Sequence, residues 1–175
     1  MKRHCTIRTP LGDMIAMVEQ EHLCGLWFTD QKYAPEFFRE WPPDPDDPIF
    51  AALRGQLDAY FTGRFSRFDL PLAPQGTGFQ KAVWALLRAI PPGTVTTYGA
   101  LARQLAAGGE GRVTSARAVG SAVGHNPISI VIPCHRVVGA DGSLTGYAGG
   151  LKRKAALLSL ESVEHPSRWR RFTDS

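Results

Sequence analysis

The 175-residue sequence predicts an α/β protein of the α+β type, with a small N-terminal antiparallel sheet and one helix, followed by a mostly helical C-terminal domain. Apolar runs of strand length occupy residues 4–30. From residue 49 onward, apolar residues recur instead at helical spacings. The linker Leu72–Gly78, "LAPQGTG", follows the first helix, so we expect domains at 1–75 and 76–175.

The first domain is predicted to contain three strands and a helix. Residues 4–10 alternate loosely, and residues 12–20 and 22–30 are two apolar-rich runs that predict a hairpin. The proline-rich connector Trp41–Pro48 then excludes a central strand and should be followed by an amphipathic helix at Ile49–Thr62. The apolar face of this helix comprises Phe50, Leu53, Leu57 and Phe61.

The second domain is predicted to be built from four helices. Thr77 is a candidate cap for the first helix, which "PPG" at Pro91–Gly93 ends. Its apolar face comprises Phe79, Val83, Leu86, Leu87 and Ile90. Two short helices should follow at Thr96–Ala107 and Ser115–Gly124, and a last one at Gly149–Ser162.

The net charge of +4 conceals an asymmetry between the halves. Residues 1–75 contain 8 basic and 11 acidic residues, a net of −3, whereas residues 76–175 contain 12 and 5, a net of +7. A basic half of this kind suits a polyanionic partner, although a solvated basic surface without a partner explains it too. No apolar run approaches the roughly 20 residues of a membrane span, and the start lacks the apolar stretch of a signal peptide. We therefore expect no membrane association and a cytoplasmic protein, or a nuclear one in a eukaryote.

The three cysteines, Cys5, Cys24 and Cys134, do not suggest a disulfide framework. No CxxC or HExxH motif occurs, so we expect no metal. Cys5 and Cys24 could gather with His4 and His22 around an ion, but we favour Cys24 as a small strand hydrophobe and Cys5 as a residue near a frayed end.

The two short helices of the basic half resemble a DNA-binding helix-turn-helix, although two packed helices without that role are the commoner explanation of such a pattern. The second helix consists of Ser, Ala, Val and Gly with one long polar side chain, Arg117. Such a helix cannot read base edges in the major groove, but it can approach the minor groove closely. Arg117 could then enter the base stack, which predicts weak sequence preference and base extrusion. The alternative is an internal helix with Arg117 at its solvent edge.

The run "ISIVI" at residues 128–132 predicts a strand buried on both faces, which Pro133 should end. Cys134 would then be presented at a strand end, followed directly by His135. Neighbours on a strand point to opposite faces, so contact between the thiol and the imidazole requires a bend or a water. Glu161, near the end of the last helix, could orient the imidazole and complete a relay that ionises the thiol. The alternative is a structural Cys–His pair.

The stretch "IPCHRVVG", followed by "TGYAGGLKRK", resembles the O6-alkylguanine-DNA alkyltransferases, also called methylated-DNA–protein-cysteine methyltransferases. "ARAVG" at Ala116–Gly120 and "NP" at Asn126–Pro127 extend the resemblance, which is strong from Phe79 to Glu161 and diffuse in residues 1–75. The resemblance implies a ribonuclease H-like sheet domain and a helix-turn-helix or winged-helix domain.

The resemblance also implies the chemistry. Cys134 takes the alkyl group from O6 of a guanine flipped out of duplex DNA, and His135 acts through a water with Glu161 behind it. Asn126 braces the turn before the cysteine, and Tyr98 donates to the leaving guanine. The backbone carbonyls of Cys134 and Val137 read the exocyclic amine, Tyr147 walls the pocket, and the backbone N–H of Ala148 meets O6. The implied pocket comprises Val137, Tyr147, Ala148 and Gly149, and the implied DNA-binding residues are Ser115, Ala116, Arg117, Ala118 and Gly120.

The implied enzyme is a methylated-DNA–protein-cysteine S-methyltransferase that works once, because no residue here would remove the stable thioether. Its expected partner is double-stranded DNA, bound through the minor groove by a monomer that could bind cooperatively, and no cofactor is expected. Two features depart from the family pattern. Some members have a serine at the position of Ala148, and the turn Gly108–Thr114 is long for a helix-turn-helix.

Two other functions compete with this interpretation. A Cys-His-Glu hydrolase would need an oxyanion hole and would leave the helix bearing Arg117 unexplained. A binding module, such as a winged-helix regulator or a non-catalytic damage sensor, would not need Cys134.

Overall fold

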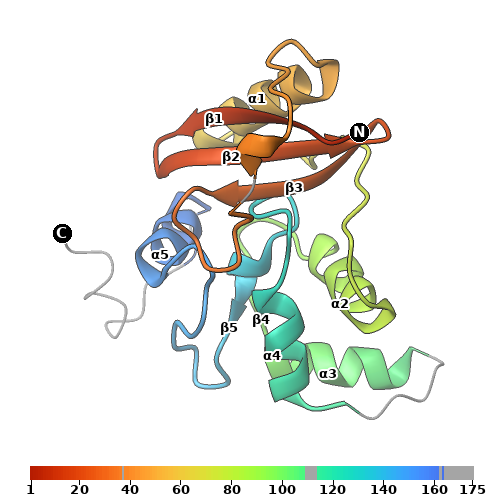
Figure 1. Ribbon diagram of the computed structural model, residues 1–175. Helices are drawn as coiled ribbons and strands as arrows, with labels where there is room; N and C mark the ends of the chain where they lie inside the picture. The colour runs from red at the N-terminus through yellow and green to blue at the C-terminus, as the bar shows by residue number, and fades with distance from the viewer. Residues whose placement is uncertain (37, 109–113, 162, 164–175) are drawn as a thin grey trace. The chain divides into compact units, whose positions relative to one another are not determined.

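A computed structural model describes residues 1–36, 38–108, 114–161 and 163, and Figure 1 shows its elements. The chain forms two compact units. One contains Met1–Gln75 together with Pro127–Val131, and the other contains Gly76–Asn126 and the chain from Ile132 onward. The chain therefore leaves the second unit for five residues immediately before the segment that carries Cys134.

The first unit is built on an antiparallel sheet in the order β1-β2-β3. Its strands are β1 (Arg3–Thr9), β2 (Gly12–Glu19) and β3 (His22–Phe28), and β2 and β3 form the predicted hairpin. Gln20 and Glu21 turn the chain between them with φ angles of 48° and 59°, the positive values that a tight hairpin turn requires. The interior of β2 and β3 is almost continuously buried, which explains why their sequences are apolar rather than alternating.

Helix α1 (Pro48–Phe61) packs beside the sheet, after the short 3₁₀ helix η1 (Phe38–Glu40). Asp47 caps α1 by accepting a hydrogen bond at Oδ1 from Ile49 N at 2.8 Å, and Pro48 occupies the first turn, where its missing N–H costs nothing. The other carboxylate oxygen of Asp47 accepts from Arg3 Nη2 at 2.6 Å, which ties the helix start to β1. The predicted face is buried at Phe50, Leu53 and Leu57, with Tyr60 beside them.

The segment at residues 128–132 is a buried turn, so the strand that we predicted there is wrong. Only Ile128 pairs, through an isolated parallel bridge to Leu26. Ser129 N donates to Leu26 O at 2.9 Å, and Val131 N folds back onto Ser129 O at 2.8 Å. Ile130 has a φ of 70°, which no strand residue adopts. The β-branched residues here serve burial in the first unit rather than a strand ladder.

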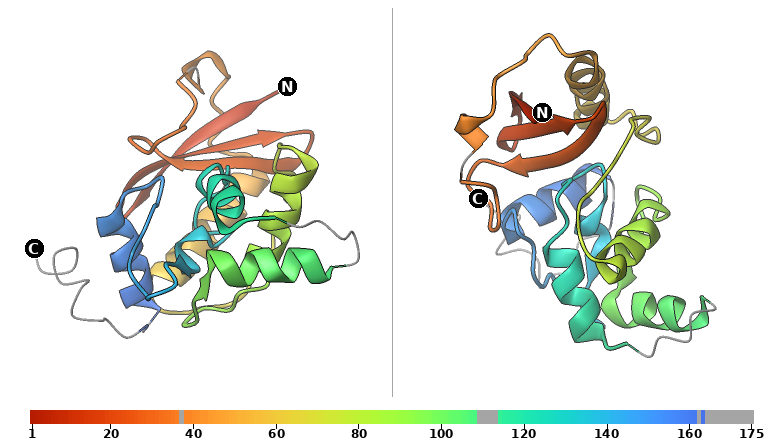
Figure 2. Two further views of the ribbon diagram at one scale, coloured as in Figure 1. Left: turned by 90° about the horizontal axis from the view of Figure 1, so that it is seen from below. Right: turned by 45° about the vertical axis from the view of Figure 1, so that its right-hand side comes forward.

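The second unit consists mainly of helices. They are α2 (Gly78–Arg88), α3 (Tyr98–Ala107), α4 (Ala116–Gly124) and α5 (Leu151–Leu160). A capping box starts α2, in which Thr77 Oγ1 accepts from Gln80 N and Gln80 Oε1 accepts from Thr77 N. Trp84 of α2 donates through Nε1 to Ala122 O of α4 at 2.8 Å, and α3 packs against both helices (Figures 1 and 2).

A two-stranded parallel sheet joins distant parts of the second unit. Strand β4 (Thr96–Thr97) pairs with β5 (Val137–Val138), with Thr96 opposite Val137. Because Tyr98 follows β4 directly and Cys134 precedes β5 by three residues, this pairing brings the start of α3 toward the predicted nucleophile. Residues 109–113 of the long turn and the basic tail Arg168–Phe172 lie outside the described residues.

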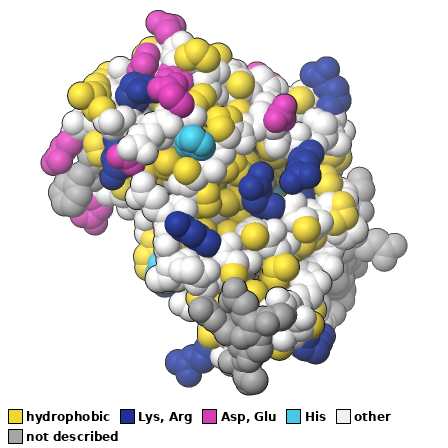
Figure 3. Space-filling model, turned by 90° about the vertical axis from the view of Figure 1, so that its right-hand side faces the viewer, with side chains coloured by type: hydrophobic (Ala, Val, Ile, Leu, Met, Phe, Trp, Pro, Cys, Tyr) yellow, Lys and Arg dark blue, Asp and Glu magenta, His cyan; other side chains and the backbone are white. Residues whose placement is uncertain are grey.

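In the described part of the chain, none of the helices has both the length and the apolar character needed to cross a bilayer. On the face in Figure 3, most acidic side chains gather in one area, which also holds some basic ones, and further basic side chains lie outside this area. This distribution agrees with the opposite net charges of the two halves of the sequence.

Candidate active site

Cys134 opens a single turn of 3₁₀ helix, η2 (Cys134–Arg136). The chain enters it through Pro133, with φ and ψ of −81° and 65°, and Cys134 N donates to Ile132 O at 2.8 Å. Cys134 retains 8% of its exposure, so the presentation at an exposed strand end that we expected is wrong. The 3₁₀ turn also bends the backbone directly after Pro133, which contact between the side chains of Cys134 and His135 would require.

Two polar side chains act on the Cys134 thiol. Burial raises the pKa of this thiol, whereas a hydrogen bond from the Asn126 side chain and the positive charge of Lys154 lower the pKa. Asn126 is itself buried, and its Nδ2 donates to Ile132 O at 2.7 Å. Asn126 is therefore bonded both to the turn before Cys134 and to the sulfur.

His135 and Glu161 are in direct contact. His135 Nε2 lies 2.6 Å from Glu161 Oε2, and neither side chain is exposed to solvent. Burial lowers the pKa of His135, and the Glu161 carboxylate offsets this in part, so the imidazole is neutral at pH 7. Among the described residues, none provides a hydrogen-bond partner for the buried His135 Nδ1, which leaves this nitrogen available to a bridging water.

Arg136 is the largest addition that the structure makes to the predicted relay. Its Nε donates to Glu161 Oε1 at 2.8 Å and its Nη2 donates to Glu161 Oε2 at 3.0 Å, a bidentate pair, while Nη1 donates to Ile90 O at 2.6 Å. Glu161 stands at the C-terminal end of α5, so these bonds fasten that helix to η2. The sequence does contain a sign of this contact, because an arginine next to a buried apolar run needs an anion. No residue near Arg136 in the sequence identifies Glu161 as that anion.

Tyr98 begins α3 and reaches the loop that precedes α5. Its hydroxyl donates to Thr145 O at 2.8 Å, and burial raises the pKa of the phenol. Lys154 of α5 donates to the same carbonyl at 2.9 Å and to Gly146 O at 3.1 Å. Of the predicted pocket residues, Val137 and Gly149 are buried and Tyr147 and Ala148 are half-buried. Lys154 was not identified from the sequence, where it stands among the basic residues of "LKRK".

Helix α4 has a buried face and an exposed face, and both consist mainly of small residues. Val119, Ala122 and Val123 are buried, whereas Ser115, Ala116 and Arg117 are exposed and Ala118 and Gly120 are half-buried. Ser115 caps the helix, its Oγ accepting from Ala118 N at 3.1 Å. The exposed start of α4 therefore presents one long cation on a surface of small side chains, rather than an internal helix.

The cysteines of the first unit are held by protein groups. Cys5 is buried inside β1 and accepts from Arg54 Nη1 at 3.2 Å, so its expected place near a frayed end is wrong. Cys24 Sγ lies 3.4 Å from His22 O. Within the described ranges, no three His, Cys, Asp or Glu side chains gather as a metal site would require, so His4 and His22 do not join these thiols around an ion.

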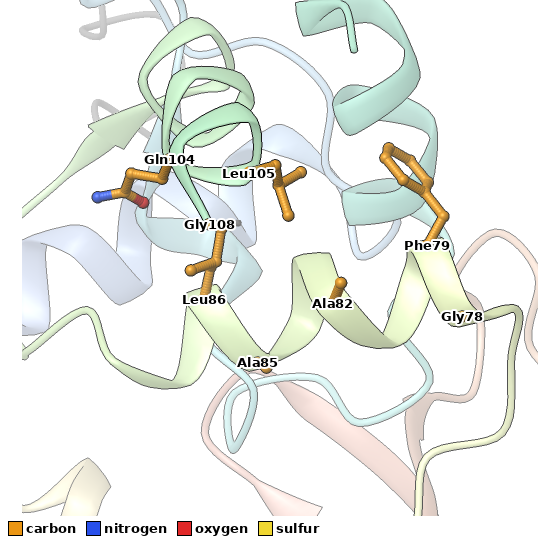
Figure 4. Close-up of a pocket in the computed structure, with 8 residues that line it drawn as sticks. All are labelled: Gly78, Phe79, Ala82, Ala85, Leu86, Gln104, Leu105 and Gly108. Atoms are coloured by element: carbon orange, nitrogen blue, oxygen red, sulfur yellow. The ribbon is translucent and has the colours of Figure 1, made fainter. Parts of the chain in front are cut away.

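A groove of about 480 Å³ runs between α2 and α3. Figure 4 shows Leu105 of α3 pointing toward α2 above this groove. The lining residues are Gly78, Phe79, Ala82, Ala85, Leu86, Gln104, Leu105 and Gly108. None of them is a predicted site residue, and none carries a nucleophile or an ionisable group, so we assign the chemistry to the surroundings of Cys134 instead.

Two models of one protein family match consecutive parts of the chain. The model of the 6-O-methylguanine DNA methyltransferase ribonuclease-like domain matches residues 2–74, and that of the DNA-binding domain of the same family matches residues 78–163. The chain belongs to the 6-O-methylguanine DNA methyltransferase family. The predicted family, fold class and enzyme class are thereby confirmed.

Relatives of this methyltransferase are similar to it over nearly the whole length of the chain. The methylated-DNA–protein-cysteine methyltransferase of Mycobacterium bovis is 44% identical, over 95% of this chain and 96% of its own. The crystal structure of Mycobacterium tuberculosis O6-methylguanine methyltransferase is 43% identical with a TM-score of 0.81, covering 98% and 99% of the two chains. A crystal structure of the Mycobacterium tuberculosis OGT in complex with DNA is also similar, with a TM-score of 0.78, 43% identity and coverage of 95% and 96%.

Proposed function

We propose that this DNA repair methyltransferase flips O6-alkylguanine out of duplex DNA and transfers the alkyl group irreversibly to its own Cys134. The observation that carries the proposal is that the buried thiol of Cys134 is followed directly in η2 by a buried, neutral His135, whose Nε2 lies 2.6 Å from Glu161 Oε2. A neutral imidazole can accept a proton, and an adjacent carboxylate stabilises the imidazolium that results. Such a pair beside a thiol is the arrangement that nucleophilic catalysis requires.

The transfer is a displacement at the alkyl carbon. The thiol proton leaves through a water to His135, and the thiolate sulfur forms a bond to the alkyl carbon as the bond from that carbon to O6 breaks. The electron pair of the broken bond stays on the guanine, where a hydrogen bond donated by the Tyr98 hydroxyl stabilises the developing negative charge, and the released base takes up a proton from water. The product is a thioether on Cys134, which no group in the described site is suited to hydrolyse, so each molecule would work once.

The outer face of α4 supports DNA binding through the minor groove. Small exposed residues at Ser115 and Ala116 permit close approach of the helix, and Arg117 is the one long side chain beside them. A cation there could replace an extruded base in the stack and prolong the open state. The monomeric state and cooperative binding along DNA stay predictions.

Mass spectrometry tests the transfer. After incubation with an oligonucleotide that contains O6-methylguanine, we expect one added methyl group, located on Cys134, and no second turnover. Cys134→Ala should abolish the mass gain and keep DNA binding, whereas Cys24→Ala, a change at another buried thiol, should keep the gain. A methyl group on a different residue, or several turnovers per molecule, would refute the proposal.

Arg117→Ala tests base flipping in the same assay. The variant should slow transfer from duplex DNA about tenfold or more and leave transfer from free O6-benzylguanine near the wild-type rate, because the free base needs no extrusion. Arg103→Ala, at an exposed arginine of the neighbouring α3, is the matched control. Equal losses on both substrates would remove the proposed role of Arg117.

A further inference from the structure

The chain makes a strained turn at Ile130, shortly before Cys134. Val131 N donates to Ser129 O at 2.8 Å across this residue, and the φ of Ile130 is 70°. A hydrogen bond between residues i and i+2, with a positive φ at the residue between them, marks the rare and strained form of the γ-turn. A β-branched side chain disfavours that φ, so other contacts must hold Ile130 in this conformation.

A second γ-turn follows, and it needs no such support. Cys134 N donates to Ile132 O at 2.8 Å across Pro133, whose φ and ψ are −81° and 65°. This is the common form of the γ-turn, and the proline ring fixes φ near the required value. The course of the chain up to Cys134 therefore depends on two short turns, of which the one at Ile130 is strained.

Hydrogen bonds to β3 and to the loop after it hold the residues before the strained turn. Leu26 N donates to Pro127 O at 2.8 Å, and Ser129 N donates to Leu26 O at 2.9 Å. The Ser129 hydroxyl donates to Gln31 Oε1 at 3.2 Å, and the same oxygen accepts from Phe28 N at 2.9 Å. Because a backbone N–H can only donate, the Gln31 amide must face Phe28 with its oxygen, and Ser129 must be the second donor to that oxygen.

The hydrogen bond between Ser129 and Gln31 is shielded from water. Ser129 is 1% exposed and Gln31 is 7% exposed. Loss of the Gln31 oxygen would leave a buried hydroxyl without its acceptor, directly beside the strained residue. A rotation of Ile130 toward negative φ would then release backbone strain, and it would also redirect the chain that leads to Cys134.

We propose that Gln31 and Ser129 are positioning residues for alkyl transfer, because their hydrogen bond holds the strained turn from which the chain reaches Cys134. The inference rests on the proposed function, since the sulfur that is positioned is the proposed alkyl acceptor. Asn126 holds the segment on the other side of the turn, where its Nδ2 donates to Ile132 O at 2.7 Å. With both sides held, the segment fixes where η2 begins and hence the place of the sulfur.

Single-turnover kinetics test the proposal on the full chain, with duplex DNA that contains O6-methylguanine. Gln31→Met keeps the length of the side chain and removes the acceptor oxygen. We expect the rate constant of methyl transfer at saturating DNA to fall about tenfold, because a small displacement of a reacting atom slows a reaction strongly. The Kd for DNA should stay the same. Transfer from free O6-benzylguanine should slow to the same extent, because the change concerns the sulfur and not base flipping.

Two outcomes of this experiment would overturn the inference and leave the proposed function standing. One is a rate constant equal to that of the wild type. The other is a smaller fraction of active molecules that transfer at the wild-type rate, which would show that Gln31 only stabilises the fold. Gln56→Met is the matched control, because Gln56 Oε1 also accepts from a backbone N–H of the first unit, that of Asp69, at 2.8 Å. Its rate constant should equal that of the wild type.

A double-mutant cycle isolates the hydrogen bond itself. Ser129→Ala should lower the rate constant about as much as Gln31→Met, and the double variant should be no slower than either, because all three lack the same bond. Losses that multiply in the double variant would mean that the two residues act independently, which would contradict the proposed pairing.

Hydrogen exchange in the wild type covers the case in which these variants do not fold. The amides of Ser129 and Val131 donate to buried carbonyl groups of the first unit, so they should exchange as slowly as the amides inside β2. Exchange many times faster than in β2 would show a turn that opens freely, and the inference would be wrong. Failure of the wild type to accept a methyl group at all would instead refute the proposed function.

Discussion

Cys24 in the first unit and Cys134 in the second are both buried thiols, yet their surroundings differ. Their exposures are 4% and 8%, and burial is the main cause that raises the pKa of each. Around Cys24 lie apolar side chains, Met17 and Trp27, its sulfur donates to a backbone carbonyl, and the charges of Glu19 and Lys2 shift its pKa in opposite directions. Around Cys134 stand an amide and an ammonium that lower the thiol pKa.

The comparison shows that burial disfavours the thiolate at both positions. What distinguishes Cys134 is a set of buried polar groups that each depend on another, Asn126 on Ile132 O, His135 on Glu161, and Glu161 on Arg136. Such networks cost stability when one member is removed, because the remaining groups lose their partners in a site without water. Cys24 has no comparable dependence, and the predictions below test this contrast.

The largest expected effect is on Glu161→Gln. This change leaves the buried guanidinium of Arg136 without its anion, and it replaces one of the two acceptor oxygens that serve His135 and Arg136 with an NH2 donor. We expect the free energy of unfolding to fall by about 3 kcal/mol, together with most of the transfer rate. Chemical denaturation measures the loss.

Glu21→Gln is the matched control, because the carboxylate of Glu21 meets Arg3 at 3.3 Å with its side chain 77% exposed. Its loss should stay below about 0.5 kcal/mol, as for other solvent-exposed pairs. Equal losses in the two variants would mean that the anion beside Cys134 is no more essential than a surface charge.

An intermediate effect is expected for Asn126→Ala. The buried Ile132 carbonyl loses its side-chain donor and the Cys134 sulfur loses a hydrogen bond, so unfolding should become easier by about 2 kcal/mol and the pKa of Cys134 should rise. Denaturation and iodoacetamide titration measure the two changes. Gln56→Ala removes an amide bonded to Asp69 O at the surface and should cost less than half as much. A Cys134 pKa that stays constant in Asn126→Ala would contradict the assigned contact.

The smallest effect concerns acid stability. Because the folded-state pKa of His135 is lowered, the unfolded chain binds more protons below pH 6.5, and stability is lost as the pH falls through that range. The slope contributed by one such histidine reaches at most about 1.4 kcal/mol per pH unit. His135→Asn should flatten the fall in unfolding free energy between pH 7 and pH 5, whereas His22→Asn, at an exposed histidine near Cys24, should not. An unaltered slope in His135→Asn would mean that this imidazole accepts its proton in the folded state.

Much of the fold followed from local patterns. The hairpin of β2 and β3, the cap at Thr77 and the four helices of the second unit are readable because apolar spacing and capping residues act over a few positions. Cys134, His135 and Glu161 were also identified from the sequence, and the structure brings the last two together at 2.6 Å.

The segment before Cys134 was misread because apolar β-branched residues report burial and not conformation. Residues 128–132 look like a strand, but their partners, Leu26 and Gln31, lie about a hundred positions earlier. The contacts are an isolated bridge from Ile128 to Leu26 and hydrogen bonds from Ser129 to Leu26 O and Gln31 Oε1. Arg136 and Lys154 were missed for a related reason. A basic residue in sequence looks the same whether it meets solvent or a buried anion.

The groups that can react, a thiol, an imidazole and a carboxylate, could be recognised from residue types and spacing, as could most of the helices. Their charge states, in contrast, follow from the folded environment. The pKa of Cys134, the neutrality of His135 and the burial of Lys154 each depend on groups brought together from separate elements of the second unit. Electrostatic interactions depend on distance and on the exclusion of water, and neither is encoded by neighbours along the chain.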